Sequence, residues 1–188
     1  MISFYITPEE KNFLLTLARK VITAKVEGIT ISKDDYFSDT LNKYSGVFVS
    51  LHKRGQLRGC IGYVEGIKPL QDAVIDMALS AAFDDPRFSP LEKDELEDIE
   101  IEISVLSPLQ IVSKIESIQI GKHGLIVEKG FNRGLLLPQV AVEYNWNKEE
   151  FLEHTCQKAG LSQNSWKDPS TKIQIFSAEI FSETDQKY

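Results

Sequence analysis

Only two of the 188 residues are cysteines, and they lie far apart, at positions 60 and 156. Neither belongs to a Cys-x-x-Cys pattern, which excludes a zinc or redox motif of that kind and gives no basis for a disulfide framework. The three histidines do not have the local spacing of a metal-ligand pair. We therefore expect two free thiols and no metal site, and the sequence identifies no cofactor.

Clusters of positive charge and long apolar runs are also missing. The formal net charge is −7, and duplex nucleic acid is bound by a basic face, so we expect no nucleic-acid partner. No stretch approaches the length of a membrane span. The segment Met1 to Tyr5 lacks the basic residues and apolar run of a secretory leader. We expect a cytoplasmic protein without membrane contact.

The composition of the chain is that of a folded globular protein, with 42% apolar and 26% charged residues. Its length allows one sizeable core or two closely packed lobes, but not two ordinary independent domains. We expect one compact domain over residues 1–188.

Two segments carry helix signals at both ends. Thr7-Pro8-Glu9-Glu10 combines an N-cap, a proline at the first helical position and a glutamate placed to bond back, and apolar residues recur at helical spacing up to Ile22. Asn147-Lys148-Glu149-Glu150 provides another cap, and Gly160 fits a left-handed stop after the apolar stripe. Both segments predict helices, with the polar residues 33–43 as a loop after the first.

Two further helices are expected in the middle of the chain. One follows Pro69 and ends near Asp84, because Pro86 disfavours helical geometry at the residue before it. The Asp-Pro-Arg-Phe segment is then a loop at a helix C-terminus. Ser89-Pro90-Leu91-Glu92 repeats the capping arrangement and predicts a short helix ending near Leu96.

Elsewhere the apolar residues alternate with a period of two. Residues 47–64 do so around the turn Lys53-Arg54-Gly55-Gln56 and predict a β-hairpin. Residues 99–105 alternate isoleucine and valine with glutamate and serine, which is typical of an antiparallel strand with one wet face. Residues 121–137 predict a second hairpin, and residues 173–181 a last strand. These patterns favour an α+β fold with antiparallel sheets flanked by helices.

The hexapeptide Leu57-Arg58-Gly59-Cys60-Ile61-Gly62 resembles the hallmark of the AMMECR family. Segments similar to the family's other blocks follow in the same order: Ala81-Ala82-Phe83-Asp84-Asp85-Pro86-Arg87-Phe88, Ile103-Ser104-Val105-Leu106, Gly121-Lys122-His123-Gly124, Leu137-Pro138-Gln139-Val140 and Lys158-Ala159-Gly160-Leu161. The resemblance covers roughly Phe4 to Glu183 and extends to the A component of the AmmeMemoRadiSam system. It implies an α+β fold in two intimately packed lobes and association with a Memo-type protein and a radical-SAM protein. It does not imply a known reaction.

The hexapeptide also suggests chemistry of its own. In an unbroken strand, Arg58, Cys60 and Gly62 share one face, and a cation beside a thiol favours the nucleophilic thiolate. Gly59 and Gly62 allow a ligand or another backbone to approach closely. A small buried cysteine, in a strand whose glycines relieve crowding against a helix, explains the same residues about equally well. Nucleotide binding is only weakly indicated, because the Lys-Ser/Thr of a phosphate loop is missing.

Further residues are candidates for the site. Asp84, Asp85 and Arg87 could supply acid–base or carboxylate-binding groups, and of these Asp84 and Arg87 are assigned to substrate binding. An Asp–Arg pair that holds a helix C-terminal turn is the alternative explanation of this loop. His123 is a candidate general base, with a solvated turn histidine as the alternative. Cys156 lies on an apolar helical stripe and is expected in the core.

We further predict that the loop Asp84–Phe88 lies against the hexapeptide strand and forms one wall of a shared cleft. Arg58 and Arg87 would give that cleft a positive potential suited to a carboxylate or phosphate.

Two functions remain open at this point. The first is an enzyme or enzyme subunit acting on a small cytosolic metabolite, with Cys60 as nucleophile or covalent acceptor and Arg58 activating it or binding a substrate anion. The second is a non-catalytic adaptor or binding module for Memo-type and radical-SAM partner proteins. Accessibility of the Cys60 thiol distinguishes them, since an enzyme needs an open thiol and a scaffold does not.

Overall fold

The structure, a computed structural model, describes residues 5–30 and 38–186. Positions 33–37 of the predicted loop and residues 1–4 of the amino-terminal segment lie outside the described residues. The chain divides into two compact units: unit 1 consists of Met1–Leu106 and Glu179–Tyr188, and unit 2 of Ser107–Ala178.

Unit 1 contains an antiparallel sheet of β1 (Val47–Lys53), β2 (Gln56–Tyr63) and β3 (Ile99–Leu106), with β1 in the middle. The hairpin between β1 and β2 turns through Arg54 and Gly55, whose φ angles are 53° and 76°. Two positive φ angles in a two-residue loop are those of a type I′ turn, whose twist matches the strands. The predicted hairpin and the predicted alternating strand are both confirmed.

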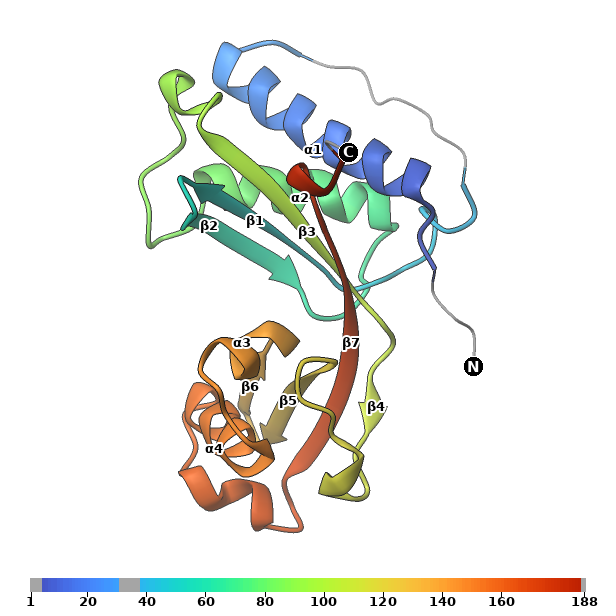
Figure 1. Cartoon of the computed structure of the whole chain (residues 1–188), viewed down its shortest axis with the longest axis vertical. Coiled ribbons are helices and arrows are strands. Elements are labelled where there is room, and N and C mark those ends of the chain that lie inside the picture. The colour runs from blue at the N-terminus through green and yellow to red at the C-terminus, as the bar shows by residue number, and fades with distance from the viewer. Residues whose placement is uncertain (1–4, 31–37, 187–188) are drawn as a thin grey trace. The chain divides into compact units, whose positions relative to one another are not determined.

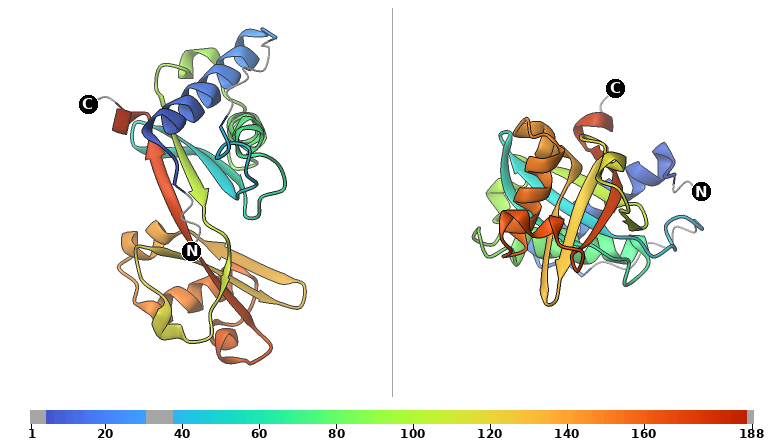
Figure 2. Two further views of the ribbon diagram at one scale, coloured as in Figure 1. Left: turned by 90° about the vertical axis from the view of Figure 1, so that its right-hand side faces the viewer. Right: turned by 90° about the horizontal axis from the view of Figure 1, so that it is seen from below.

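The helices α1 (Pro8–Glu27) and α2 (Leu70–Phe83) pack against each other on one face of this sheet, as Figures 1 and 2 show. The capping box predicted for α1 is present: the Glu10 N–H donates to Thr7 Oγ1 at 3.2 Å, and the Thr7 N–H donates to Glu10 Oε2 at 2.9 Å. Helix α2 lies over β1 and β2, and it ends at Phe83 with Asp84 as its C-cap, which confirms the end predicted near Asp84. Unit 1 closes with η4 (Thr184–Gln186).

The core of unit 1 fills the space between these helices and the sheet. It is made of apolar side chains from α1, α2 and all three strands, which alternate inward along each strand. Burial of this kind contributes roughly 25 cal/mol for each Å² of apolar surface removed from water. The other face of the sheet therefore carries the polar residues of the period-two pattern, among them Cys60 and Ser50.

The short helix predicted after the Asp-Pro-Arg-Phe loop is only partly present. A single 3-10 turn, η1 (Lys93–Glu95), forms where the helix was expected to end, and its cap is Glu92 instead of the predicted Ser89. The Leu91 N–H donates to the Ala82 carbonyl at 2.9 Å, which ties this segment to the last turn of α2. The predicted start of the helix at Ser89 is therefore wrong, because the Leu91 N–H bonds to α2 and not to its own segment.

Unit 2 has an antiparallel sheet in which β5 (His123–Lys129) lies between β6 (Asn132–Leu136) and β7 (Lys172–Ser182). A two-residue strand, β4 (Gln110–Ile111), pairs with the other edge of β7 and was not predicted. The division between the units falls within β7, so its last residues belong to unit 1. The predicted hairpin at residues 121–137 and the last strand are confirmed.

The helices of unit 2 are α3 (Pro138–Glu143) and α4 (Lys148–Lys158), with 3-10 turns η2 (Ile115–Ser117) and η3 (Gln163–Lys167). The cap and the glycine stop predicted for α4 are present, whereas α3 and the 3-10 turns were not predicted. The α+β class with antiparallel sheets and flanking helices is thus confirmed. None of the helices in the described parts of the chain is both long and apolar enough to cross a membrane.

Candidate functional site

Cys60 lies on β2, which pairs with β1 in the sheet of unit 1, directly opposite Ser50 of β1. The Cys60 side chain is partly exposed. The Ser50 hydroxyl donates to Cys60 Sγ at 3.3 Å, and Ser50 itself is buried. A fixed hydroxyl donor aimed at a sulfur stabilises negative charge that develops there.

A β-bulge interrupts the hexapeptide at Arg58. In the β1–β2 ladder Leu51 lies opposite Gly59, but the next residue, His52, lies opposite Leu57, so Arg58 is the extra residue. A bulge redirects the side chain of the inserted residue. The unbroken two-residue period assumed for this segment is therefore wrong at Arg58, which has different partners from Cys60.

Arg58 is held by an acidic residue that the sequence did not indicate. Its Nε donates to Glu95 Oε1 at 3.0 Å and its Nη2 to Glu95 Oε2 at 2.8 Å, while Nη2 also reaches the Ser89 carbonyl at 3.0 Å. Lys53 Nζ donates to the same carboxylate at 2.9 Å. Hydrogen bonds from Arg58, and also from Lys53, hold the pKa of Glu95 at about 2. Most of the Arg58 charge is thus compensated within unit 1.

The loop after α2 hydrogen-bonds to both backbone groups of Cys60. Asp85 Oδ2 accepts the Cys60 N–H at 2.9 Å, and Arg87 Nη2 donates to the Cys60 carbonyl at 3.2 Å. Asp85 and Arg87 are themselves joined by two bonds, Nε to Oδ1 at 2.9 Å and Nη2 to Oδ2 at 2.7 Å. The predicted contact between this loop and the hexapeptide strand is confirmed, and so is the Asp–Arg pair that was its structural alternative.

Asp85, not the predicted Asp84, is the acidic residue in contact with Cys60. The Asp85 side chain is 2% exposed, whereas that of Arg87 is 54% exposed. Hydrogen bonds from Arg87 and from the Cys60 and Arg87 backbone hold the pKa of Asp85 far below its usual range. Asp84 is exposed and caps the end of α2 through its backbone, so its role in substrate binding remains a prediction.

The positive potential expected here is smaller than the arginines alone suggest. The Phe88 ring lies 5.8 Å from the guanidinium carbon of Arg58 and 5.5 Å from that of Arg87. Each guanidinium is paired with its own carboxylate, and Lys53 is the remaining cation of the group. The three cations and two carboxylates of this group leave one net positive charge. Among the cations, the half-exposed Arg87 is the one accessible to an anion.

The two glycines of the hexapeptide are occupied by protein packing. A Cβ atom on Gly59 would lie 2.1 Å from the Ala81 carbonyl oxygen of α2. A Cβ on Gly62 would lie 2.3 Å from the ring of Phe48. Close approach of another part of the chain, one of the two interpretations of these glycines, therefore accounts for both, and their predicted part in substrate binding remains untested.

His123 and Cys156 both belong to unit 2. His123 begins β5, where its Nδ1 accepts the Gln119 N–H at 3.2 Å, and burial together with the nearby Lys122 lowers the pKa of its imidazole. Its role as a general base remains a prediction. Cys156 is fully buried in the core of unit 2, and this burial raises the pKa of its thiol. The core assignment of Cys156 is confirmed.

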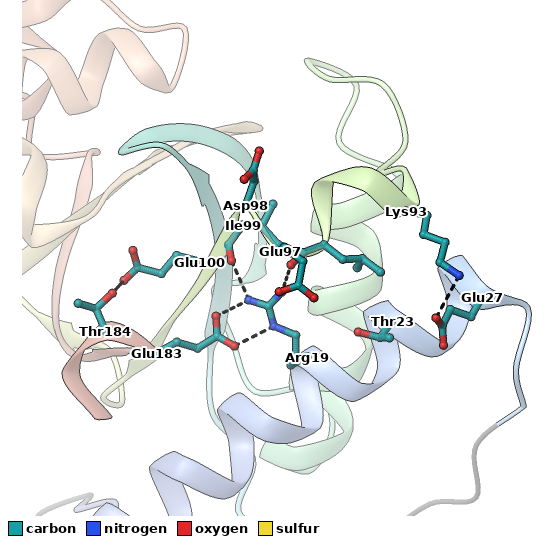
Figure 3. A pocket seen from close by; sticks show the side chains of 11 residues that line it. Arg19, Thr23, Glu27, Lys93, Glu97, Asp98, Ile99, Glu100, Glu183 and Thr184 are labelled. Carbon is teal, nitrogen blue, oxygen red and sulfur yellow. Dashed lines mark hydrogen bonds and ion pairs between the residues drawn. The ribbon is translucent and has the colours of Figure 1, made fainter. Parts of the chain in front are cut away.

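Unit 1 also contains a cavity of about 720 Å³ that the sequence did not indicate, shown in Figure 3. At its centre Arg19 of α1 donates to the Leu96 carbonyl at 2.7 Å, to the Ile99 carbonyl at 2.8 Å and to the Glu183 carboxylate. The lining includes neither the hexapeptide nor the loop after α2. Across residues 5–30 and 38–186, no group of three or more His, Cys, Asp or Glu side chains is placed to hold a metal ion.

Comparison with known proteins gives consistent matches over nearly the whole chain. A family model described as AMMECR1 matches residues 15–181. A protein of Methanothermobacter thermautotrophicus is 47% identical over 182 residues, which are 93% of this chain and 95% of the relative. A protein of Aquifex aeolicus is 44% identical over 179 residues, or 92% of each chain. The crystal structure of the uncharacterized protein PH0010 from Pyrococcus horikoshii has a TM-score of 0.88 at 42% identity, over 95% of this chain and 93% of that one.

Proposed function

The chain belongs to the AMMECR1 family, and from this premise we propose that it is an enzyme or enzyme subunit that acts on a small cytosolic metabolite through the thiol of Cys60. In this proposal the whole chain serves as one AMMECR-type domain. The observation that carries it is the contrast between the two thiols: Cys60 is partly exposed with a hydroxyl aimed at its sulfur, whereas Cys156 is sealed in a core.

The contacts around Cys60 support a division of roles. Cys60 is the nucleophile or covalent acceptor, and the Ser50 hydroxyl stabilises charge on its sulfur. Arg87, with half of its side chain exposed beside the Cys60 carbonyl, binds an anionic group of the substrate. Arg58 has a structural role, because its ion pair with Glu95 links β2 to η1. His123 is retained as the candidate general base.

The test is untargeted metabolite profiling with the purified wild-type protein and a Cys60→Ser variant. We expect at least one metabolite to be consumed, or bound as an adduct, by the wild type and not by the variant. A Cys156→Ala variant is the matched control, because this thiol is buried in the core of unit 2, and its metabolite profile should match that of the wild type. Equal profiles for the wild type and Cys60→Ser would contradict the proposal.

A second candidate is an adaptor that binds Memo-type and radical-SAM proteins, as the A component of the AmmeMemoRadiSam system. The observation that favours it is the fully exposed Phe131 at the turn of the β5–β6 hairpin, which Figure 2 shows extending from unit 2. Val142 and Tyr144 of the same unit are also largely exposed. Exposed aromatic side chains of this kind are common anchors of protein interfaces.

Titration calorimetry with each purified partner tests this role. An adaptor binds the partner with wild-type affinity after Cys60→Ser and loses affinity after Phe131→Ser. The opposite pattern, in which only Cys60→Ser weakens binding, assigns the contact to the thiol site. Absence of binding to both partners rejects the adaptor role.

A further inference from the structure

The backbone of Cys60 is held from the side of β2 that faces away from β1. Cys60 lies opposite Ser50 in the antiparallel ladder, yet both its N–H and its carbonyl bond to the loop after α2. In an antiparallel pair, a residue whose two backbone groups both point outward occupies a non-hydrogen-bonded site. At this one residue the Asp85–Arg87 pair thus stands where a neighbouring strand would lie.

From this geometry we propose that Asp85, acting together with Arg87, is the positioning residue of the Cys60 site. This inference rests on the function proposed for Cys60, since it identifies the contacts that hold the thiol next to Ser50. Asp85 accepts one backbone bond from Cys60 and also fixes the guanidinium that supplies the other. A single buried carboxylate therefore orders both polar groups of the Cys60 backbone, at the edge of a sheet where strands otherwise fray.

The pair also places two opposite charges beside one thiol. Asp85 disfavours negative charge on the sulfur and Arg87 favours it, so the intact pair balances the two effects. The charged groups nearby include Arg58 and Lys53, which both pair with Glu95 of η1, and Glu102 of β3, which lies in register with Ser50. Removing either member of the pair leaves the charge of the other uncompensated.

The test compares Asp85→Asn, Arg87→Gln and a control, Asp98→Asn, in the full chain. Asp98 forms an Asp–Arg pair with Arg54 at 3.1 Å, on the surface of the same unit. Two quantities are measured in each variant. One is the hydrogen-exchange rate of the Cys60 amide by NMR, and the other is the rate of iodoacetamide alkylation of Cys60 as a function of pH.

We expect the Cys60 amide to exchange faster in Asp85→Asn, because a neutral amide oxygen is a weaker acceptor than a carboxylate. The alkylation profile should move to lower pH by roughly half a pH unit in Asp85→Asn, and to higher pH by about the same amount in Arg87→Gln, as for a charge several ångströms from the thiol. The control should match the wild type in both measurements.

Three results would overturn the positioning role. They are shifts of both profiles in the same direction, faster exchange with no shift of either profile, and wild-type behaviour in both measurements. If Asp85→Asn does not fold, Arg87→Gln decides alone, since its profile must move to higher pH. Opposite shifts in a protein whose Cys60→Ser variant retains metabolite turnover would keep the positioning role and reject the proposed function.

Discussion

Replacement of Gly59 by alanine tests whether the hexapeptide glycine serves packing. The added Cβ would lie 2.1 Å from the Ala81 carbonyl oxygen and 3.1 Å from its carbon, and both are backbone atoms of α2. An ordinary contact begins at 3.4 Å, so β2 and α2 must separate by more than 1 Å. No side-chain rotation relieves this contact.

Overpacking of this kind costs typically 1–3 kcal/mol, and we expect about 3 kcal/mol of strain because backbone must move on both sides. Alanine recovers about 0.5–1 kcal/mol by restricting the unfolded chain, and Gly59 does not require a positive φ. The net expected loss in the free energy of unfolding is therefore about 2 kcal/mol.

Urea titration followed by far-UV circular dichroism measures this loss. Dichroism is preferable to fluorescence because both tryptophans, Trp146 and Trp166, lie in unit 2. Gly130→Ala is the control: nothing lies within 4 Å of the added Cβ, but φ is 60°. It should lose only about 1–2 kcal/mol, from backbone strain in unit 2. A Gly59→Ala protein as stable as the wild type would refute the packing argument and return Gly59 to the ligand-binding interpretation.

Two further predictions concern Cys60 and Glu95. Cys60→Ser should keep the free energy of unfolding close to that of the wild type, because the site is partly exposed and Ser50 can bond the new hydroxyl; a loss of several kcal/mol in urea titration would instead assign Cys60 to packing. The Glu95 pKa falls from its ordinary 4.5 to about 2 in the folded state, so its ion pair stabilises the protein above pH 4.5 and this contribution is lost as the pH falls toward 2. Glu95→Gln should flatten that part of the stability curve, and an unchanged acid dependence would show that the Arg58 pair contributes nothing.

Much of the fold was predictable because its signals are local. The Thr7 and Asn147 caps, the Arg54–Gly55 turn and the alternating strands each depend on residues within a few positions of one another, and the structure has all of them. The strand β4 and the short helix α3 carried no comparable signal. Their two and six residues are too few for a periodic pattern to stand out.

The candidate site was predictable only in part, since its decisive contacts are not local. Arg58 and Glu95 are 37 positions apart, and Cys60 and Asp85 are 25 positions apart. Between adjacent aspartates, spacing does not reveal which one turns inward, so Asp84 was chosen where Asp85 makes the contact. The bulge at Arg58 depends on the pairing of β2 with β1, and no residue pattern in the hexapeptide itself indicates it.

The central claim is that Cys60 carries the reactive thiol of this AMMECR1 protein. Brief iodoacetamide treatment of the folded chain tests it most directly. Peptide mass spectrometry then reports which thiol has reacted. We predict that Cys60 is labelled first, while Cys156, fully buried and with a raised thiol pKa, reacts only after unfolding. Preferential labelling of Cys156, or a Cys60 that stays unlabelled until the protein is denatured, would contradict the claim.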